Sequence, residues 1–473
     1  MTYFAFAKYG GMIVSLCITM ILSRILTPSD FAIIVLANIV INFFSVVSTV
    51  GIGPAIIQNK TLSDKNIEDI FSFTLYLALI LSAIYIFFIP LLVEFYGRNR
   101  LLENIFYLLS FNVFFALVTI VPNALILKQK KFQFLALRTI FIHIITGVIS
   151  ILTALKGLGI YALLITPIFG SILLFTTSYI YVPVKIRCDF SIVSIKKILS
   201  FSFYQILFNI VYILYRAIDK ILIGRYFSMD ILGYYEKSYR LMMLPLENVS
   251  NVINPVLHPI LSDYQNEKKI ILNAYSKMIT LLAYLGFSLS VFIFFTSSEL
   301  IVLIFGEQWL PSVPVFKILS LSIGPQIIQS PIGAVFQAIN QVKSLFYASI
   351  IVMITTILAV IIGIYQHSVE KLALYLVLTM FVANFIYNIY LCRHLKCKLL
   401  FIFTLLFKPL FYTIVLASIF YIYSILCPIK AIFFSFSIKG LIFMLYMLIC
   451  VYAGCFDELP AAKRISVFIK RIC

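Results

Sequence analysis

The chain is 473 residues long, 63% of its residues are hydrophobic and only 11% are charged. That balance excludes the soluble globular classes and is typical of a polytopic helical membrane protein. The formal net charge is +18, but no compact basic domain with interleaved aromatic residues is present, so nucleic acid is not expected as a partner. In a membrane protein, an excess of Lys and Arg usually lies in cytoplasmic loops.

Apolar runs of about twenty residues, separated by charged residues, Gly and Pro, predict the membrane spans. Lys8 precedes the first run without a small-residue cleavage site after it, so this run is expected to be a retained span and not a signal peptide. The connectors are too short to hold a folded soluble domain. About fourteen runs are predicted as spans, at 9–26, 31–57, 69–95, 101–127, 134–155, 158–182, 200–224, 231–260, 270–296, 313–339, 344–365, 370–392, 405–426 and 431–454.

The distribution of Lys and Arg predicts the orientation of these spans. With the N-terminus inside the cell, the cytoplasmic connectors hold most of the basic residues, such as those at 128–131 and 183–198. The opposite side holds far fewer. Both termini are therefore expected in the cytoplasm. Arg24 and Arg225 fall near the outer ends of their helices, where we expect them to anchor the helices at the interface.

A weak internal repeat suggests how the spans are grouped. The segments Arg24–Phe31 and Arg225–Ile231 each contain an Arg, then a Ser or Thr, then an Asp, a pattern that suits a helix N-cap with an acid in the first turn. Capping alone would explain the pattern, but its recurrence favours two six-helix lobes of the same orientation. The predicted organisation is an N-terminal lobe at 1–182, a basic cytoplasmic linker at 183–198, a second lobe at 199–395, two additional spans at 396–455 and a basic cytoplasmic tail at 456–473.

Polar and charged side chains share one face of the predicted helix at 205–223. The spacing that places them together is that of a helix with 3.6 residues per turn. Ionisable groups inside a bilayer are unfavourable, so they face a wet cavity or each other. The residues on this face are Gln205, Asn209, Tyr212, Arg216, Asp219 and Lys220; the next span continues with Glu236, Arg240, Glu247, Asn251, Asn254 and His258, and the span at 31–57 has a milder version in Asn38, Asn42, Ser45 and Thr49.

Two interpretations of these polar faces compete. Ser, Thr and Asn can hydrogen-bond across a packed helix bundle, which would make the faces purely structural. Bundle packing does not need several charges in series, so the spans at 200–224 and 231–260 favour a hydrated cavity. Arg216 with Asp219, and Glu236 with Arg240, have the spacing of helical salt bridges. Because positive and negative charges nearly balance, the pattern predicts a hydrated cavity more firmly than an anion site.

The motifs of several other function classes are missing. The sequence has no Gly-x-x-x-x-Gly-Lys-Ser/Thr loop, so nucleotide hydrolysis is not expected to drive transport. No soluble domain carries a catalytic dyad, and an enzyme is not predicted. Cys392, His394 and Cys397 form the one tight cluster of possible metal ligands, but a metal site would need further ligands. Neither a metal nor a cofactor is expected.

Several segments, taken together and in order, resemble a known family. The chain is similar to the polysaccharide transporters, or O-antigen flippases, of the multidrug/oligosaccharidyl-lipid/polysaccharide exporter superfamily. The resemblance covers roughly residues 5 to 340, and beyond that point only hydropathy supports it. The matching segments are Leu22–Phe31, Gly51–Gln58, Val121–Leu125, Gly157–Leu163, Asp219–Arg225, Ser238–Leu246 and Phe305–Pro311.

The resemblance implies two lobes around a central cavity in a bacterial cytoplasmic membrane. It also implies that an undecaprenyl-pyrophosphate-linked oligosaccharide moves to the outer leaflet during assembly of O-antigen, capsule or exopolysaccharide. Alternating access by rocking of the lobes, coupled to an ion gradient or to consumption of the product, is the expected mechanism. A polysaccharide polymerase and chain-length machinery are potential partners.

The chemistry of the polar faces fits that substrate. Arginine and lysine suit phosphate oxygens, amide and phenol groups suit sugar hydroxyls, and buried carboxylates suit a coupling proton or sodium ion. Arg216, Lys220 and Arg240 are the candidates for the pyrophosphate, Asn209, Tyr212, Asn38 and Asn42 for the sugars, and Asp219, Glu247 and Glu236 for ion coupling.

Two other functions remain open. A multidrug or small-solute exporter of the same architecture would use carboxylates and aromatic residues to bind cationic drugs, and this chain has both. A membrane polymerase or ligase would be an enzyme and normally carries a large extracytoplasmic loop with Arg and His residues. The sequence has no such loop.

Overall fold

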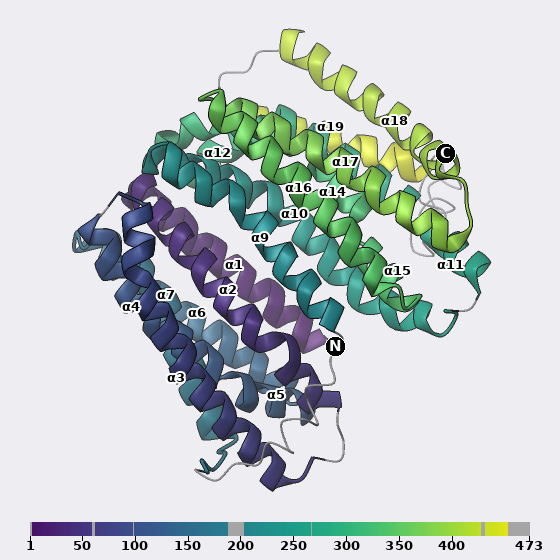
Figure 1. The fold of residues 1–473 in the computed structure, drawn as a ribbon. Helices are drawn as coiled ribbons and strands as arrows, with labels where there is room; N and C mark the ends of the chain where they lie inside the picture. Colours follow the sequence, from purple (N-terminus) through teal and green to yellow (C-terminus); the bar gives the residue numbers. More distant parts are fainter. Residues whose placement is uncertain are drawn as a thin grey trace. The chain divides into compact units, whose positions relative to one another are not determined.

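The computed structural model describes residues 2–58, 62–97, 99–187, 203–265, 267–426 and 431–452. Every regular element in these ranges is a helix (Figure 1), so the predicted all-α class is confirmed. Within the ranges, the side chains that are not described are those of residues 2–9, 40, 42–51, 54–55, 58, 203–210, 212–213, 251–252, 254–256 and 258–259.

The chain divides into two compact units, Met1–Gly233 and Tyr234–Cys473. In the first unit α1 packs along α6, α3 along α4, and both α4 and α6 along α7, while α9 packs on α2 (Figure 1). The helices of this unit are α1 (Thr2–Ile25), α2 (Pro28–Gln58), α3 (Asp64–Phe95), α4 (Arg100–Val118), α5 (Ile120–Lys128), α6 (Phe132–Leu155), α7 (Tyr161–Tyr181) and α9 (Phe203–Tyr226).

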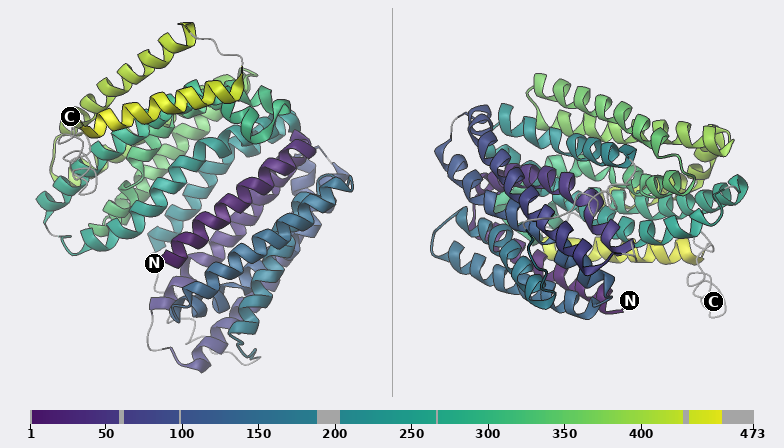
Figure 2. Two further views of the ribbon diagram at one scale, coloured as in Figure 1. Left: turned by 180° about the vertical axis from the view of Figure 1, so that it is seen from behind. Right: turned by 60° about the horizontal axis from the view of Figure 1, so that its bottom comes forward.

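The second unit contains most of α10 and all later helices. α16 packs along α17, and α11 packs against both α14 and α18. Figure 2 shows α18 and α19 as two long helices at the C-terminal end of the chain. The helices are α10 (Met229–Ser262), α11 (Lys268–Phe295), α12 (Ser297–Phe305), the 3-10 helix η1 (Glu307–Ser312), α13 (Val313–Ser320), α14 (Ile323–Gln329), α15 (Ile332–Ala338), α16 (Val342–Tyr365), α17 (Val369–Leu395), α18 (Leu399–Leu426) and α19 (Ile432–Tyr452).

Each predicted span coincides with one helix or with a chain of short helices. The run at 101–127 is divided into α4 and α5 at Thr119, and the run at 313–339 into α13, α14 and α15. Among the described residues, nine helices are long and apolar enough to cross a membrane, and a tenth is added if the pair Glu307–Ser320 and Ile323–Ala338, bent by 47°, is one span. The multi-pass membrane class is confirmed, whereas the count of about fourteen, the orientation and the lobe boundaries stay predictions.

The two turns of the internal repeat are helix N-caps. The N–H and Oγ1 of Thr27 both donate to Asp30 Oδ2, at 3.0 and 2.7 Å. In the second copy, Ser228 Oγ accepts from the Ile231 N–H at 3.3 Å. These contacts satisfy backbone donors that the first turn of a helix leaves free. The capping interpretation of the repeat is therefore confirmed.

The same two turns touch each other at a glycine. A Cβ atom placed on Gly233, in the first turn of α10, would lie 2.1 Å from the carbonyl oxygen of Pro28 at the start of α2. Nearby, a Cβ on Gly224 would meet Leu36 Cδ2 at 3.2 Å. Small residues of this kind let membrane helices approach closely, which is how such helices gain packing energy without a hydrophobic driving force. Gly233 therefore fixes the junction of α2 and α10.

We expect Gly233→Ala to destabilise the protein by about 1–3 kcal/mol, because the new methyl group meets backbone atoms that have no alternative rotamer. Gly440→Ala is the matched control, since nothing lies within 4 Å of a Cβ at that position of α19. The control should be neutral or slightly stabilising, by up to about 1 kcal/mol, through helix propensity. Thermal unfolding of the purified variants in detergent measures both, and equal melting temperatures would contradict the close contact.

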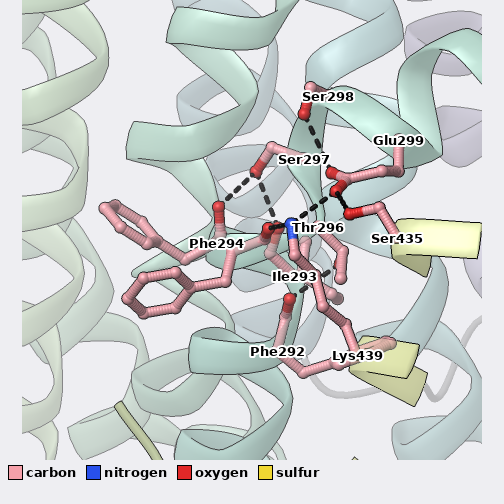
Figure 3. A network of polar contacts seen from close by, with 10 residues as sticks. Phe292, Ile293, Phe294, Thr296, Ser297, Ser298, Glu299, Ser435 and Lys439 are labelled. Carbon is pink, nitrogen blue, oxygen red and sulfur yellow. Dashed lines mark hydrogen bonds and ion pairs between the residues drawn. The ribbon is translucent and has the colours of Figure 1, made fainter. Parts of the chain in front are cut away.

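Within the second unit, a buried ion pair joins α19 to α12 (Figure 3). Lys439 Nζ, on α19, is in contact with Glu299 Oε1, on α12, and their side chains are only 12% and 7% exposed. Ser435 Oγ donates to Glu299 Oε1 at 2.7 Å, and Ser298 Oγ donates to Glu299 Oε2 at 2.8 Å. Lys439 also donates to the Phe295 carbonyl at 2.7 Å, so the ammonium group caps the carboxyl end of α11.

Removing one partner leaves the other buried and charged, so we expect Glu299→Gln or Lys439→Met to destabilise the protein by about 3–5 kcal/mol. The double variant should lose less than the sum of the two single losses, because no lone charge remains. Lys408→Met on α18, where the lysine is exposed, is the control and should change little. The free energy of unfolding of the wild type, the two single variants and the double variant is measured in mixed micelles. If the double variant loses the sum of the two single losses, Glu299 and Lys439 do not interact.

Candidate functional site

The predicted site residues of α9 lie in the first unit. Asp219 is buried, and its Oδ1 accepts a hydrogen bond from the Lys220 N–H at 2.8 Å. Arg216 and Lys220 are half-buried. The side chains of Asn209 and Tyr212 lie outside the described residues. The described end of this polar face therefore carries two partly buried cations next to a buried carboxylate.

The predicted residues of α10 and α2 are more accessible. On α10, Glu236 is half-buried, whereas Arg240 and Glu247 are exposed. Asn38 of α2 is exposed, and the side chain of Asn42 lies outside the described residues. The charged residues of α9 and α10 belong to different units. Their convergence on one cavity, and the Arg216–Asp219 and Glu236–Arg240 salt bridges, stay predictions.

Arg225, in the last turn of α9, has a different environment. It is exposed, and its guanidinium carbon lies 5.4 Å from the centre of the Phe95 ring at the end of α3. Beside it, Tyr96 Oη lies 3.5 Å from the Ile221 carbonyl, at the limit of a hydrogen bond. An arginine that stacks on an aromatic ring at a helix end suits the predicted role as an interfacial anchor.

Sequence reasoning missed a buried lysine on α10. Lys237 is 3% exposed, and its ammonium nitrogen lies 4.5 Å from the centre of the Phe305 ring and 4.8 Å from that of Trp309. The next residue, Ser238, donates to the Ser312 carbonyl at 2.8 Å. These contacts fasten α10 to α12 and η1. Phe305 and Trp309 were the sequence feature that could have predicted a buried cation nearby, because aromatic faces attract cations.

A second missed residue is Arg138 on α6. Its Nη1 donates to Ser178 Oγ at 2.5 Å and its Nη2 to Asn123 Oδ1 at 2.9 Å, and the guanidinium carbon lies 5.8 Å from the centre of the Phe134 ring. The side chain is 8% exposed. A single arginine in an apolar run was the available signal, because such residues are rare inside membranes.

Several segments that carry the family resemblance therefore form structural joints. Asn123 accepts from Arg138, and Ser238 and Trp309 connect α10 with the segment after α12. Gly306, between α12 and η1, has φ +102°, a backbone conformation that residues with a side chain rarely adopt. These parts of the resemblance thus hold helices together, whereas its segment Asp219–Arg225 contains charged residues of the functional prediction.

The cluster at the end of α17 forms ordinary contacts. His394 Nε2 lies 2.8 Å from Ser344 Oγ, and Cys392 is buried. In the part of the chain that the structure describes, no three His, Cys, Asp or Glu residues are grouped so that they could hold a metal ion.

Known structures share this fold. The structure of the lipid II flippase MurJ in an inward closed conformation matches with a TM-score of 0.77 and 18% identity, over 97% of this chain and 100% of that chain. An inward-facing multidrug resistance MATE transporter of the MOP superfamily matches with a TM-score of 0.65 and 13% identity, over 82% of this chain and 94% of that chain. The two-lobed transporter fold expected from the sequence is therefore confirmed at the level of fold.

Relatives are found in polysaccharide pathways. An uncharacterized membrane protein in the cps region of Klebsiella pneumoniae is 25% identical over 330 residues, 67% of this chain and 66% of the relative. The teichuronic acid biosynthesis protein TuaB of Bacillus subtilis is 24% identical over 311 residues, 64% of this chain and 63% of the relative. The lipopolysaccharide biosynthesis protein WzxC of Escherichia coli is 22% identical over 355 residues, 72% and 70% of the two chains.

The match thus spans about two thirds of the length of these relatives. A protein family described as "Polysaccharide biosynthesis protein" matches residues 21–314, which is more than half of the chain. The two structural neighbours are a flippase and a multidrug transporter. The sequence-based resemblance to a polysaccharide family is confirmed, and the chain belongs to the family described as "Polysaccharide biosynthesis protein".

Proposed function

We propose that the protein is a flippase for an undecaprenyl-pyrophosphate-linked oligosaccharide in the bacterial cytoplasmic membrane, serving the assembly of a surface polysaccharide. The observation that carries the proposal is the set of charges on α9, where Arg216 and Lys220 are half-buried beside the buried Asp219 in a highly apolar chain. Because a charged group inside a membrane is unfavourable, charges at such positions often mark the path of a polar substrate or an ion.

The substrate explains why both cations and neutral polar groups are needed. A pyrophosphate offers oxygen atoms in a geometry that a guanidinium binds with two parallel hydrogen bonds, and an ammonium binds as a point charge. In the proposal, Arg216, Lys220 and Arg240 bind the pyrophosphate. The residues assigned to the sugar hydroxyls are Asn209, Tyr212, Asn38 and Asn42.

Alternating access by the two lobes is the proposed mechanism, with ion coupling through carboxylates. Asp219 is the leading candidate, because it is buried and one of its oxygens is held by the Lys220 backbone. Glu236 and Glu247 are the further candidates. A polysaccharide polymerase and chain-length machinery are the proposed partners. The polysaccharide relatives favour this function over the multidrug exporter, which becomes an outcome of the test below.

Deletion of the gene should abolish one surface glycan and leave its lipid-linked unit on the inner leaflet, because the head group cannot cross the apolar bilayer unaided. Glycan staining of intact cells and extraction of the lipid-linked unit measure the two effects. Complementation with the wild-type gene is the control. A normal glycan together with increased drug sensitivity would instead establish the exporter.

Replacing Arg216 with Ala should lower export about tenfold to a hundredfold, the effect of losing a hydrogen bond to a charged group. Arg216→Lys should fall between this variant and the wild type, because the charge stays and the planar fork is lost. Arg225→Ala on the same helix is the control and should export nearly normally, since Arg225 is exposed. Export is divided by the amount of protein in the membrane, and full export by Arg216→Ala combined with Lys220→Ala refutes the assignment.

A further inference from the structure

Two cysteines flank the joint between α17 and α18, which the proposed function does not use. Cys392 is in the last turn of α17, and Cys397 belongs to the segment Lys396–Lys398 that connects the two helices. Cys392 is only 5% exposed, whereas Cys397 is half-buried. A small solute can therefore reach the thiol of Cys397, while the thiol of Cys392 is shielded.

The end of α17 folds back so that the two residues approach each other. Lys396 has φ +56°, in the left-handed region, which reverses the direction of the chain. The Cys397 N–H then donates to the Cys392 carbonyl at 3.1 Å. A hydrogen bond across such a left-handed turn commonly comes with contact between the side chains of the residues that it joins. The backbone therefore brings the two cysteine side chains together.

The neighbours of the two thiols agree with this approach. The thiols interact with each other, and each of them interacts electrostatically with the phenol of Tyr275 on α11. Tyr275 is 1% exposed, and its Oη donates to Asn388 Oδ1 of α17 at 2.9 Å. This hydrogen bond holds the phenol against α17. Both thiols thus face the same buried group of a neighbouring helix.

The surroundings of Cys397 favour reaction with an oxidant. Lys396 and Lys398, which flank it, are both exposed. A partly exposed thiol next to cations is the setting in which cysteines react, whereas cysteines in apolar surroundings are inert. Cys450 on α19 is of the inert kind, since it is buried in a hydrophobic cluster. A metal ion would need at least a third ligand, and the described residues provide no such group.

We propose that Cys392 and Cys397 form a reversible disulfide when the protein meets hydrogen peroxide. Cys397 Sγ attacks one peroxide oxygen and breaks the O–O bond, so that the thiol becomes a sulfenic acid and one water leaves. Cys392 Sγ then attacks the sulfenic sulfur. The S–S bond forms, the S–O bond breaks, and the hydroxyl group leaves with the Cys392 proton as a second water. The two thiols are oxidised, the peroxide is reduced, and a dithiol reverses the reaction by exchange.

The disulfide would fasten the last turn of α17 to the chain that enters α18. The hydrogen bond between the Cys397 N–H and the Cys392 carbonyl already closes the same turn. The covalent link would therefore stabilise a conformation that the reduced protein has adopted. The inference concerns the redox chemistry of this joint and does not depend on which substrate the protein transports.

The test uses the full chain in lipid nanodiscs, which is reduced, freed of reductant, treated with hydrogen peroxide, alkylated and digested with trypsin. Trypsin cleaves after Arg393, Lys396 and Lys398, so the dipeptide Cys397–Lys398 stays attached to the peptide that ends at Arg393 only through the disulfide. We expect mass spectrometry to detect this linked pair after peroxide and to lose it after dithiothreitol. Oxidation of Cys397 without the link, or a link from either cysteine to another one, overturns the proposal.

Three variants separate the roles of the two thiols. Cys392→Ser should leave Cys397 as a sulfenic acid that dimedone labels, because no thiol condenses with it. Cys397→Ser should leave Cys392 unlabelled, since Cys392 is buried. Cys450→Ser is the matched control and should form the link as the wild type does. Dimedone labelling of Cys392 in Cys397→Ser, or loss of the link in Cys450→Ser, contradicts the assignment.

Discussion

The low dielectric of the bilayer limits where this chain can place a polar group, because a polar atom without a partner is far less stable there than in water. The structure meets this constraint in three ways. Hydroxyls such as that of Thr146 donate to carbonyls of their own helix. Arg138 and Lys237 contact neutral or aromatic groups on other segments. Glu299 and Lys439 neutralise each other. On α9, the buried Asp219 lies on the same helix as the half-buried Arg216 and Lys220, and the proposed transport function is assigned to these charges.

The helices could be predicted from the sequence because hydropathy is a local property. Every predicted span coincides with a helix or with a chain of short helices, and the caps at Thr27 and Ser228 follow from residue types at fixed spacing. The breaks at Thr119 and after Ser320 were not predicted. A break depends on how neighbouring helices re-satisfy the freed backbone groups, which a hydropathy profile does not contain.

The candidate site could be predicted only in part. Periodicity placed Arg216, Asp219 and Lys220 on one helical face, and the structure adds that Asp219 is buried while both cations are half-buried. Lys237 and Arg138 escaped prediction because their partners come from segments about 70 and 40 residues away in sequence, a distance that no periodic pattern spans. The same holds for Glu299 and Lys439, whose pairing depends on where α19 returns.

Glycines and ion pairs have complementary roles in this architecture. Where backbones approach closely at one point, as α10 and α2 do at Gly233, dispersion between them contributes to the packing. α19 has few buried residues, namely Ser435, Tyr446 and Cys450. Ser435 and Lys439 contact Glu299 near one end of α19, and Ser288 donates to Tyr446 towards the other. Between these polar contacts, Phe443 stacks on Phe292 of α11. The ion pair is the part of this attachment that a change of charge would remove, whereas the stacking of Phe443 on Phe292 would remain.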